Sequence, residues 1–248
     1  MRFLRPLPVH VALAMSGRPE NVNAGQEIED PNPVFIEGIL KYQSHPYQRD
    51  IPALDLVWEK GCSKLFYCPA TEKNEKWPSR SVVFLVPSLI NRATILDLMA
   101  DKSFVRWLAG QGHDVYLLDW GDVTEDGKLQ NMDDIVEKRL CAAGRNLLSL
   151  IGDAGETANL TGLGYCMGGT LLAAAAAIAP EIWGRLVFLA SPWDFHAGDA
   201  VLQTHICSSA PLALDMIETK GILPMEWIQT VFAAVNGDRG REKFVKFA

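Results

Sequence analysis

The feature that most constrains the fold is an alternation, from residue 80 onward, of β-rich runs with segments of helical spacing. Four runs rich in β-branched and aromatic residues are separated by stretches long enough for a helix. The runs are SVVFLVP (81–87), DVYLLDW (114–120), ANLTGLGY (158–165) and RLVFLAS (185–191). Because parallel strands need long crossover connections, this order predicts βαβ units and a mostly parallel sheet with helices on both faces. The predicted fold class is α/β.

Three intervening segments carry helical periodicity. They are residues 95–112, closed by Gly112, residues 132–152, and residues 168–179 with their run of five alanines. In the second segment Ile135, Leu140, Leu147 and Leu150 share one helical face. Asp133 and Asp134 suit the positive N-terminal end of that helix.

The chain divides into three parts on these patterns. Residues 1–50 form a turn-rich leader, in which the spacing of Phe35, Ile36, Ile39 and Leu40 predicts one short helix. Residues 51–199 form the α/β core. After Ser191 the alternation stops, and residues 200–248 give helical segments without a strand, as in a helical lid or insertion. The whole chain is expected to make a single domain, with the leader as part of it.

Composition excludes several classes of protein. The formal net charge is −7 and no run of Lys or Arg is present, which argues against a nucleic-acid partner. A small anionic substrate stays open, because a local basic pocket suffices for it. The five cysteines have no metal-ligand spacing and leave one unpaired in any disulfide scheme, so we expect no metal and a reducing, cytoplasmic setting. No segment is long and apolar enough for a membrane helix.

The sharpest motif is Gly164-Tyr165-Cys166-Met167-Gly168-Gly169, between a predicted strand and a predicted helix. It has the spacing of a nucleophile elbow, G-x-S-x-G, with Cys in place of Ser. Glycines flanking the nucleophile let strand and helix approach without Cβ clashes. The helix N-terminus favours the thiolate, and the amide of Met167 would face a developing oxyanion. The alternative is a buried structural cysteine in a glycine-rich turn.

A second oxyanion donor is expected in the loop Ser88-Leu89-Ile90-Asn91-Arg92, at the carboxyl end of the first predicted strand. The backbone amide of Leu89 or of Ile90 is the candidate, and Asn91 is expected to line the pocket. The alternative is that this loop is only a polar connection before a helix.

Four stretches together resemble the catalytic subunits of polyhydroxyalkanoate synthases, in particular the short class that works with a partner subunit. They are VPSLINRATILDL, SFVRWLAGQGHDVYLLDWG, LTGLGYCMGGTL and SPWDFHAGD. The resemblance runs from about residue 30 to the end and is most specific over residues 81–199. It implies an α/β-hydrolase-like fold, with Cys166 at the position of the family's acylated cysteine.

The resemblance also implies a substrate and partners. The substrate would be an (R)-3-hydroxyacyl-coenzyme A, with no further cofactor. The partners would be the growing polyester at a granule surface and a second synthase subunit or a second copy of the chain. The family uses an Asp and a His located after the lid. The chain ends at Ala248, so we expect it to be truncated, without those two residues and the last strands of the sheet.

We therefore considered which residues present could replace the missing base. His113 opens a strand, at the wrong edge of the sheet. His196, with Asp194, follows the strand 185–191 at the correct edge, so His196 is the geometrically allowed substitute. Pocket-shaping or lid-holding roles fit Asp194 and His196 better, since acid and base follow later strands in this fold. Asp119 and Trp120 also end a strand and are expected to line the pocket.

Three functions follow from these patterns. The first is an acyltransferase that polymerises 3-hydroxyacyl units through a Cys166 thioester. The second is a depolymerase or esterase of the same fold, because the fold supports both reactions. The third is a non-catalytic, truncated protein that binds granules or another subunit. We also expect Cys166 to be the most reactive of the five thiols, because the other four lie in apolar or strand contexts.

Overall fold

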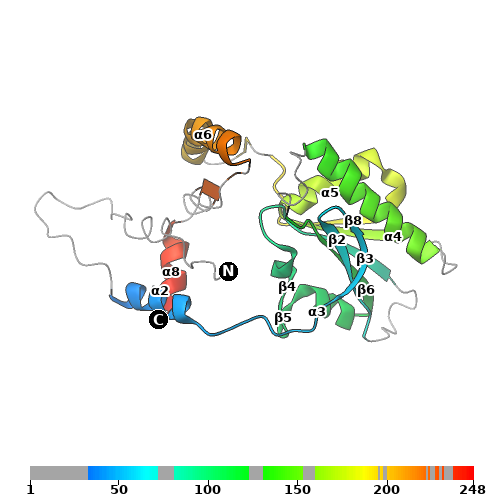
Figure 1. Ribbon diagram of the computed structural model, residues 1–248, viewed down its shortest axis with the longest axis horizontal. Coiled ribbons are helices and arrows are strands. Elements are labelled where there is room, and N and C mark those ends of the chain that lie inside the picture. Colours follow the sequence, from blue (N-terminus) through cyan, green and yellow to red (C-terminus); the bar gives the residue numbers. More distant parts are fainter. Residues whose placement is uncertain are drawn as a thin grey trace, which may run out of the picture. The chain divides into compact units, whose positions relative to one another are not determined.

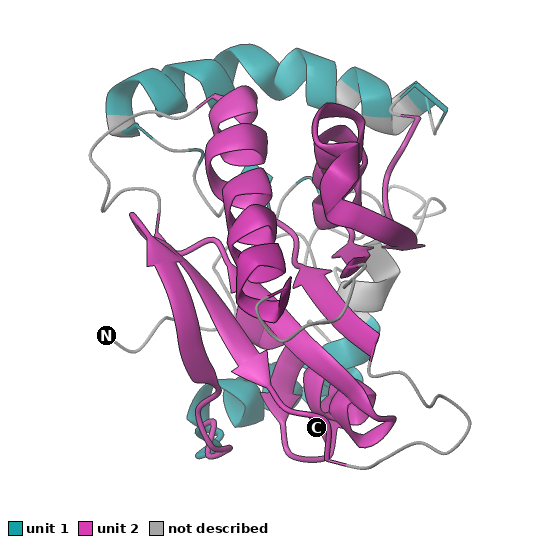
Figure 2. Ribbon diagram, turned by 90° about the vertical axis from the view of Figure 1, so that its right-hand side faces the viewer, with its two compact units in different colours: residues 1–48, 196–248 teal, residues 49–195 magenta. Residues whose placement is uncertain are grey.

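The structure is a computed structural model that describes residues 33–71, 81–122, 131–152, 160–194, 196–197, 200–221, 223, 227–228, 231 and 237–248. The chain forms two compact units, shown in different colours in Figure 2. Unit 2 is Arg49–Phe195, and unit 1 combines residues 1–48 with His196–Ala248. The expected division into a leader, a core and a lid stays a prediction.

Unit 2 is built on a six-stranded sheet (Figure 1) with the strand order β1-β2-β6-β3-β7-β8. The strands are β1 (Asp55–Lys60), β2 (Ser63–Cys68), β3 (Ser81–Val86), β6 (His113–Asp119), β7 (Leu160–Tyr165) and β8 (Trp183–Leu189). The last four strands pair in parallel, while β1 and β2 are antiparallel. All four predicted strands are therefore confirmed, in the predicted parallel arrangement.

Helices cover both faces of this sheet. They are η1 (Ala93–Leu96), α3 (Phe104–Gly110), η2 (Asp134–Cys141), α4 (Ala142–Gly152), α5 (Met167–Ile178) and η3 (Pro180–Ile182). One face packs against η2, α4 and α5 around Phe84 and Leu118. The other packs against η1 and α3 around Leu85 and Leu117. This sheet order with helices on both faces is an α/β-hydrolase-like fold, as expected.

The hairpin β1–β2 was not predicted. Its strands meet at Gly61, whose φ of 57° lies in the left-handed region that favours glycine. β2 then pairs with β6, which is distant in sequence: Leu65 lies opposite Leu118. The sequence of β2, SKLFYC, is short and mixes polar with apolar residues, so its pattern does not distinguish a strand from a loop. Long-range pairing with β6 selects the extended conformation.

The predicted helix over residues 95–112 is wrong in its first half. A short hairpin, β4 (Asp97–Met99) with β5 (Lys102–Ser103), precedes the much shorter helix α3. Asp97 is buried and accepts from Ser103, Arg106 and Arg49. Ser103 also accepts from the Arg106 amide as the N-cap of α3. These contacts hold the chain in a turn where periodicity alone predicts a helix.

The predicted helix over residues 132–152 is confirmed as two consecutive elements, the π-helical η2 and the α-helical α4. Ile135, Leu140 and Leu147 are buried, as predicted, whereas Leu150 is 49% exposed. A π-helix has more residues per turn than an α-helix. It therefore rotates the face of α4 relative to a face counted at 3.6 residues per turn, which puts Leu150 outside the core.

Unit 1 consists of helices in its described part: α2 (Pro33–Ser44), α6 (Ala200–Lys220) and α8 (Gly237–Phe247). The predicted short helix in the first part of the chain is confirmed by α2, and α6 confirms the helical character of the last part. α2 packs on α8, where the Phe244 ring lies edge-on to Phe35 and Tyr42, with centroids 5.8 and 5.7 Å away. Residues 225–235, which belong to the last part expected to be helical, lie mostly outside the described residues.

Candidate active site

Cys166 occupies the sharp turn between β7 and α5. It is the N-cap of α5, with φ 53° and ψ −130°, a backbone conformation that residues other than glycine rarely adopt. Its amide donates to the Leu189 carbonyl (2.9 Å), and its carbonyl accepts from the Gly169 amide (2.9 Å). Such strain costs ~1–3 kcal/mol and persists where the surroundings enforce it. The side chain is partly exposed.

Three glycines let this turn form. A Cβ on Gly164 would lie 2.3 Å from Gly169 Cα, and one on Gly168 would lie 2.3 Å from the Val86 carbonyl oxygen. A Cβ on Gly169 would lie 1.8 Å from Ser191 Oγ. Real Cβ atoms do not approach other atoms this closely, so only glycine fits. The start of α5 therefore packs directly against β7, the end of β3 and the segment after β8.

The loop after β3 lies beside this turn. Val86 pairs with Gly164 in the parallel register, so β3 and β7 end together. In the loop the Ile90 amide donates to the buried Ser88 Oγ (3.2 Å). Since that amide has an acceptor, Leu89 is the better candidate for a second oxyanion donor beside Met167, the first residue of α5. Asn91 is exposed at the end of the turn.

Asp119 ends β6 and Trp120 follows it, but the two residues differ in environment. The Asp119 carboxylate accepts from the Gly121 amide (3.0 Å) and is partly exposed. Trp120 is buried in the core on the α5 side of the sheet. Its indole Nε1–H donates to the Pro87 carbonyl (2.9 Å), at the start of the loop that carries Leu89.

No histidine of unit 2 lies at the end of the sheet where Cys166 is located. The sequence has a single histidine between residues 49 and 195, His113. It opens β6 and bonds Ser81 Oγ, at the end of the sheet opposite Cys166, as predicted. His196 belongs to unit 1, where its carbonyl accepts from Gln203 in the first turn of α6 (2.6 Å). Asp194 is exposed at the end of unit 2. The roles expected for Asp194 and His196 stay predictions.

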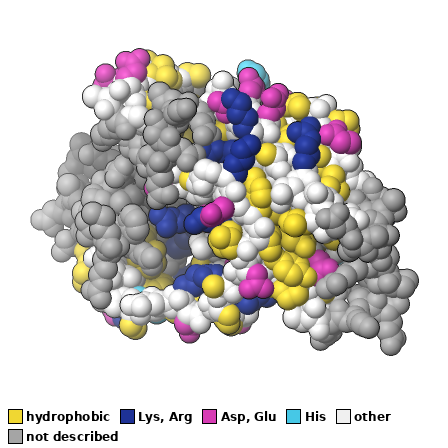
Figure 3. Space-filling view, turned by 45° about the vertical axis from the view of Figure 1, so that its right-hand side comes forward, with side chains coloured by type: hydrophobic (Ala, Val, Ile, Leu, Met, Phe, Trp, Pro, Cys, Tyr) yellow, Lys and Arg dark blue, Asp and Glu magenta, His cyan; other side chains and the backbone are white. Residues whose placement is uncertain are grey.

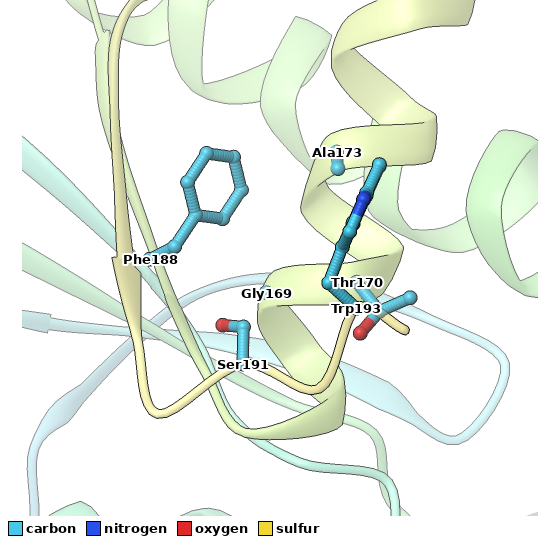
Figure 4. A pocket seen from close by; sticks show the side chains of 6 residues that line it. All are labelled: Gly169, Thr170, Ala173, Phe188, Ser191 and Trp193. Atoms are coloured by element: carbon cyan, nitrogen blue, oxygen red, sulfur yellow. The ribbon is translucent and has the colours of Figure 1, made fainter. Parts of the chain in front are cut away.

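A pocket of about 310 Å³ lies next to the first turns of α5 (Figure 4). Its lining residues come from α5, β8 and the segment after β8: Gly169, Thr170, Ala173, Phe188, Ser191 and Trp193. In Figure 4 the rings of Phe188 and Trp193 flank the space in front of Ala173. Sequence reasoning missed this pocket, although Trp193 follows a predicted strand at the edge where ligands bind in parallel sheets.

Curated proteins similar to this chain are described as poly(3-hydroxyalkanoate) polymerases or as their PhaC subunits. Poly(3-hydroxyalkanoate) polymerase subunit PhaC of Haloarcula marismortui is 30% identical over 167 residues, which are 67% of this chain and 34% of that protein. PhaC of Haloferax mediterranei is 32% identical over 154 residues, 62% of this chain and 30% of that protein. This chain is related in sequence to the poly(3-hydroxyalkanoate) polymerases. It spans about a third of the length of these relatives.

A further relative and two solved structures can also be compared with this chain. PhaC of a Synechocystis species is 29% identical over 154 residues, 60% of this chain and 40% of that protein. No protein-family model matches the chain. Among solved structures, a monoglyceride lipase from Saccharomyces cerevisiae aligns with a TM-score of 0.49 at 14% identity, over 71% of this chain and 56% of its own. A carboxyl esterase from Bacillus coagulans aligns with a TM-score of 0.46 at 13% identity, over 73% and 56% of the two chains.

The other four cysteines of this chain differ in burial. Cys62, Cys68 and Cys141 are buried. Burial raises the pKa of the Cys68 and Cys141 thiols above the ordinary value, which keeps them protonated at neutral pH. Cys207 is exposed on α6, so the expectation that it lies in an apolar context was wrong. Accessible thiols in the described part are therefore those of Cys166 and Cys207.

The described surface carries no long tract of one charge in the view of Figure 3, where Lys and Arg side chains lie among acidic, apolar and neutral ones. Within the described residues, no group of three or more His, Cys, Asp and Glu side chains is arranged to hold a metal ion. Nor is any described helix long and apolar enough to cross a membrane.

Proposed function

We propose that this chain accepts an acyl group from an (R)-3-hydroxyacyl-coenzyme A on Cys166, as the first half of polyester synthesis. The observation that carries the proposal is the strained turn at Cys166, which presents a thiol between a strand end and a helix N-terminus. The sequence relatives, described as poly(3-hydroxyalkanoate) polymerases, support the choice of substrate and product.

In the proposed first step the Cys166 sulfur attacks the thioester carbonyl carbon, and the carbonyl oxygen becomes an oxyanion. The amides of Met167 and Leu89 would stabilise that charge. Collapse of the intermediate breaks the bond to the coenzyme A sulfur, and the leaving thiolate takes up the proton that Cys166 lost. One thioester replaces another, so the acyl group stays activated. The step moves no electrons between oxidation states, and we propose no metal or redox cofactor for it.

In the second step a hydroxyl group of a 3-hydroxyacyl unit or growing chain attacks the Cys166 thioester. An ester bond forms, the bond from carbon to Cys166 sulfur breaks, and the hydroxyl proton must pass to a base. Unit 2 contains His113 as its sole histidine, at the far end of the sheet. We therefore propose that unit 2 supplies the acylation chemistry and that the base for transfer comes from outside it.

The test is to incubate the chain with (R)-3-hydroxybutyryl-coenzyme A and to measure free thiol and protein mass together. We expect one equivalent of coenzyme A and an acyl adduct on the peptide that contains Cys166. Cys166→Ala should lose both, whereas Cys207→Ala, which removes the other accessible thiol, should keep both. Thiol release that persists in Cys166→Ala would refute the proposal. Stoichiometric free 3-hydroxy acid without polyester would indicate a hydrolase instead.

Turnover beyond the first equivalent depends on that base. Loss of a general base usually costs ~10²–10⁴-fold in rate. The variant His196→Ala tests the histidine that follows the carboxyl end of β8 in sequence. Full turnover by the chain, abolished by His196→Ala, would identify His196 as the base.

A further inference from the structure

The Pro87 carbonyl accepts one hydrogen bond and lies close to the start of α5. The Trp120 indole Nε1–H donates to it at 2.9 Å. The first turn of α5 also approaches so closely that a Cβ on Gly168 would lie 2.4 Å from the Pro87 oxygen. The peptide after Pro87 opens the loop of Ser88, Leu89 and Ile90. The end of β6, the start of α5 and this loop therefore come together at the Pro87 carbonyl.

Trp120 is itself fixed in the core. Only 5% of it is exposed. Its backbone carbonyl accepts from Ser63 Oγ at 3.3 Å, from Arg139 Nη1 at 3.2 Å and from the Cys62 thiol at 3.2 Å. These donors come from β2, the turn before it and η2. The backbone at Trp120 is thus anchored by elements that do not take part in the turn at Cys166, and the ring is buried in the core.

We propose that Trp120 is a positioning residue for acyl transfer at Cys166. Its indole N–H holds the Pro87 carbonyl, and through it the Leu89 amide, at the distance from the Met167 amide that an oxyanion requires. The inference rests on the proposed function. Oxyanion donors act only when they are held in place before the charge develops, because they then need no reorganisation during the reaction.

The test variant is Trp120→Phe, which keeps an aromatic ring and removes the N–H donor. The matched control is Trp183→Phe. Trp183 is also buried in this core, at 9% exposure, and packs edge-on against Phe84. Among the described residues its Nε1 has no acceptor. The two variants thus remove equal bulk from one core, but only the first removes a hydrogen bond.

Two rates at Cys166 should be measured on the full chain. Acylation by p-nitrophenyl acetate passes through an oxyanion, whereas alkylation by iodoacetamide does not. We expect Trp120→Phe to slow acylation roughly 10- to 100-fold with little change in the alkylation rate, since loss of an oxyanion donor itself costs ~10²–10³-fold. Trp183→Phe should leave both rates close to those of wild type, because it removes no hydrogen bond among the described residues. Equal acylation rates in all three proteins would overturn the inference, as would a parallel loss of both rates in Trp120→Phe.

The use of p-nitrophenyl acetate separates this inference from the choice of natural substrate. If wild-type Cys166 reacts with this ester but not with 3-hydroxyacyl-coenzyme A, the proposed function fails while the role of Trp120 is still measured. If Cys166 is alkylated but accepts an acyl group from neither donor, the oxyanion site is absent and the inference fails. Should Trp120→Phe not fold, Ser88→Ala loosens the same loop by removing the acceptor of the Ile90 amide. It should then slow acylation selectively, and an unchanged acylation rate would refute the inference.

Discussion

At the scale of single residues, backbone conformation and exposure distinguish Cys166 from the other four cysteines. Cys166 combines a partly exposed side chain with a positive φ at the N-terminus of a helix. Cys207 is exposed on α6, and the other three are buried. Exposure alone would thus favour Cys207, whereas the strained turn between β7 and α5 distinguishes Cys166.

Alkylation should distinguish these residues. In a Cys207→Ser background, brief treatment with limiting iodoacetamide is expected to label Cys166, because Cys62, Cys68 and Cys141 are buried. Peptide mass spectrometry identifies the labelled residue. Adding Cys166→Ser should abolish rapid labelling. Preferential labelling of a buried cysteine in the single variant would contradict the placement of Cys166.

The buried thiols predict how stability depends on pH. Burial raises the pKa of Cys68 and Cys141 in the folded state, so above about pH 8.5 the unfolded chain loses these protons first. The unfolded state then binds fewer protons, and the free energy of unfolding falls as pH rises. Below about pH 8.5 both thiols are protonated in the folded and the unfolded state, so their contribution to the free energy of unfolding is fully present. Urea unfolding from pH 7.5 to 10, with reductant, measures this dependence. The double variant Cys68→Ala with Cys141→Ala should show a smaller decrease in the free energy of unfolding than wild type. Cys207→Ala should keep the wild-type slope, and an unchanged slope in the double variant would refute the explanation.

At the scale of elements, one buried carboxylate determines where a predicted helix breaks. Asp97 is 1% exposed and binds Arg49 Nη2 at 2.6 Å and Arg106 Nε at 2.9 Å. The Arg106 guanidinium also donates to the Pro52 carbonyl. The segment at the start of unit 2, the β4–β5 hairpin and α3 are therefore tied to a single side chain.

Asp97→Ala should destabilise the protein by about 2–4 kcal/mol. Removing one partner leaves the two arginines without their buried acceptor, and their partial exposure places the cost below that of a fully buried pair. Asp101→Ala, in the exposed turn of the same hairpin, is the control and should stay within about 0.5 kcal/mol of wild type. Urea unfolding followed by fluorescence measures both. Equal effects of the two substitutions would show that Asp97 does not organise these elements.

At the scale of the whole molecule, the two edges of the described sheet differ in chemistry. β1 carries Asp55, Glu59 and Lys60, as protected edge strands do. β8 has the apolar run Leu186–Leu189, exposed within unit 2 on both faces, with exposures of 38–50%. Side chains of this kind on both faces are typical of strands inside a parallel sheet. In the described part β8 pairs with β7 alone.

The edge at β8 is expected to promote self-association. Val187→Lys places a charge on that strand and should shift sedimentation velocity profiles toward the monomer. Leu56→Lys makes the same change in charge on β1, where 49% of the leucine is exposed, and should leave the profile as in wild type. If Val187→Lys has no effect, or Leu56→Lys an equal one, the β8 edge is not the contact.

The sequence by itself determined the elements whose signals are local. The strands β3, β6, β7 and β8 and the helix after Cys166 follow from periodicity, and the turn between β7 and α5 follows from the spacing of Gly164, Cys166 and Gly168. Their parallel order follows from connection length. Each of these signals lies within one segment, so neighbouring residues suffice to read it.

Only the tertiary structure decided the rest, because the contacts join segments distant in the chain. Asp97 breaks a helical pattern through Arg49, 48 residues away, and β2 becomes a strand by pairing with β6. Trp120 reaches the Pro87 carbonyl across 33 residues. The sequence places Trp120 only at the end of a strand. Whether such a side chain lines a pocket or holds a loop depends on which backbone atom folding brings within hydrogen-bond distance, and periodicity contains no information about that.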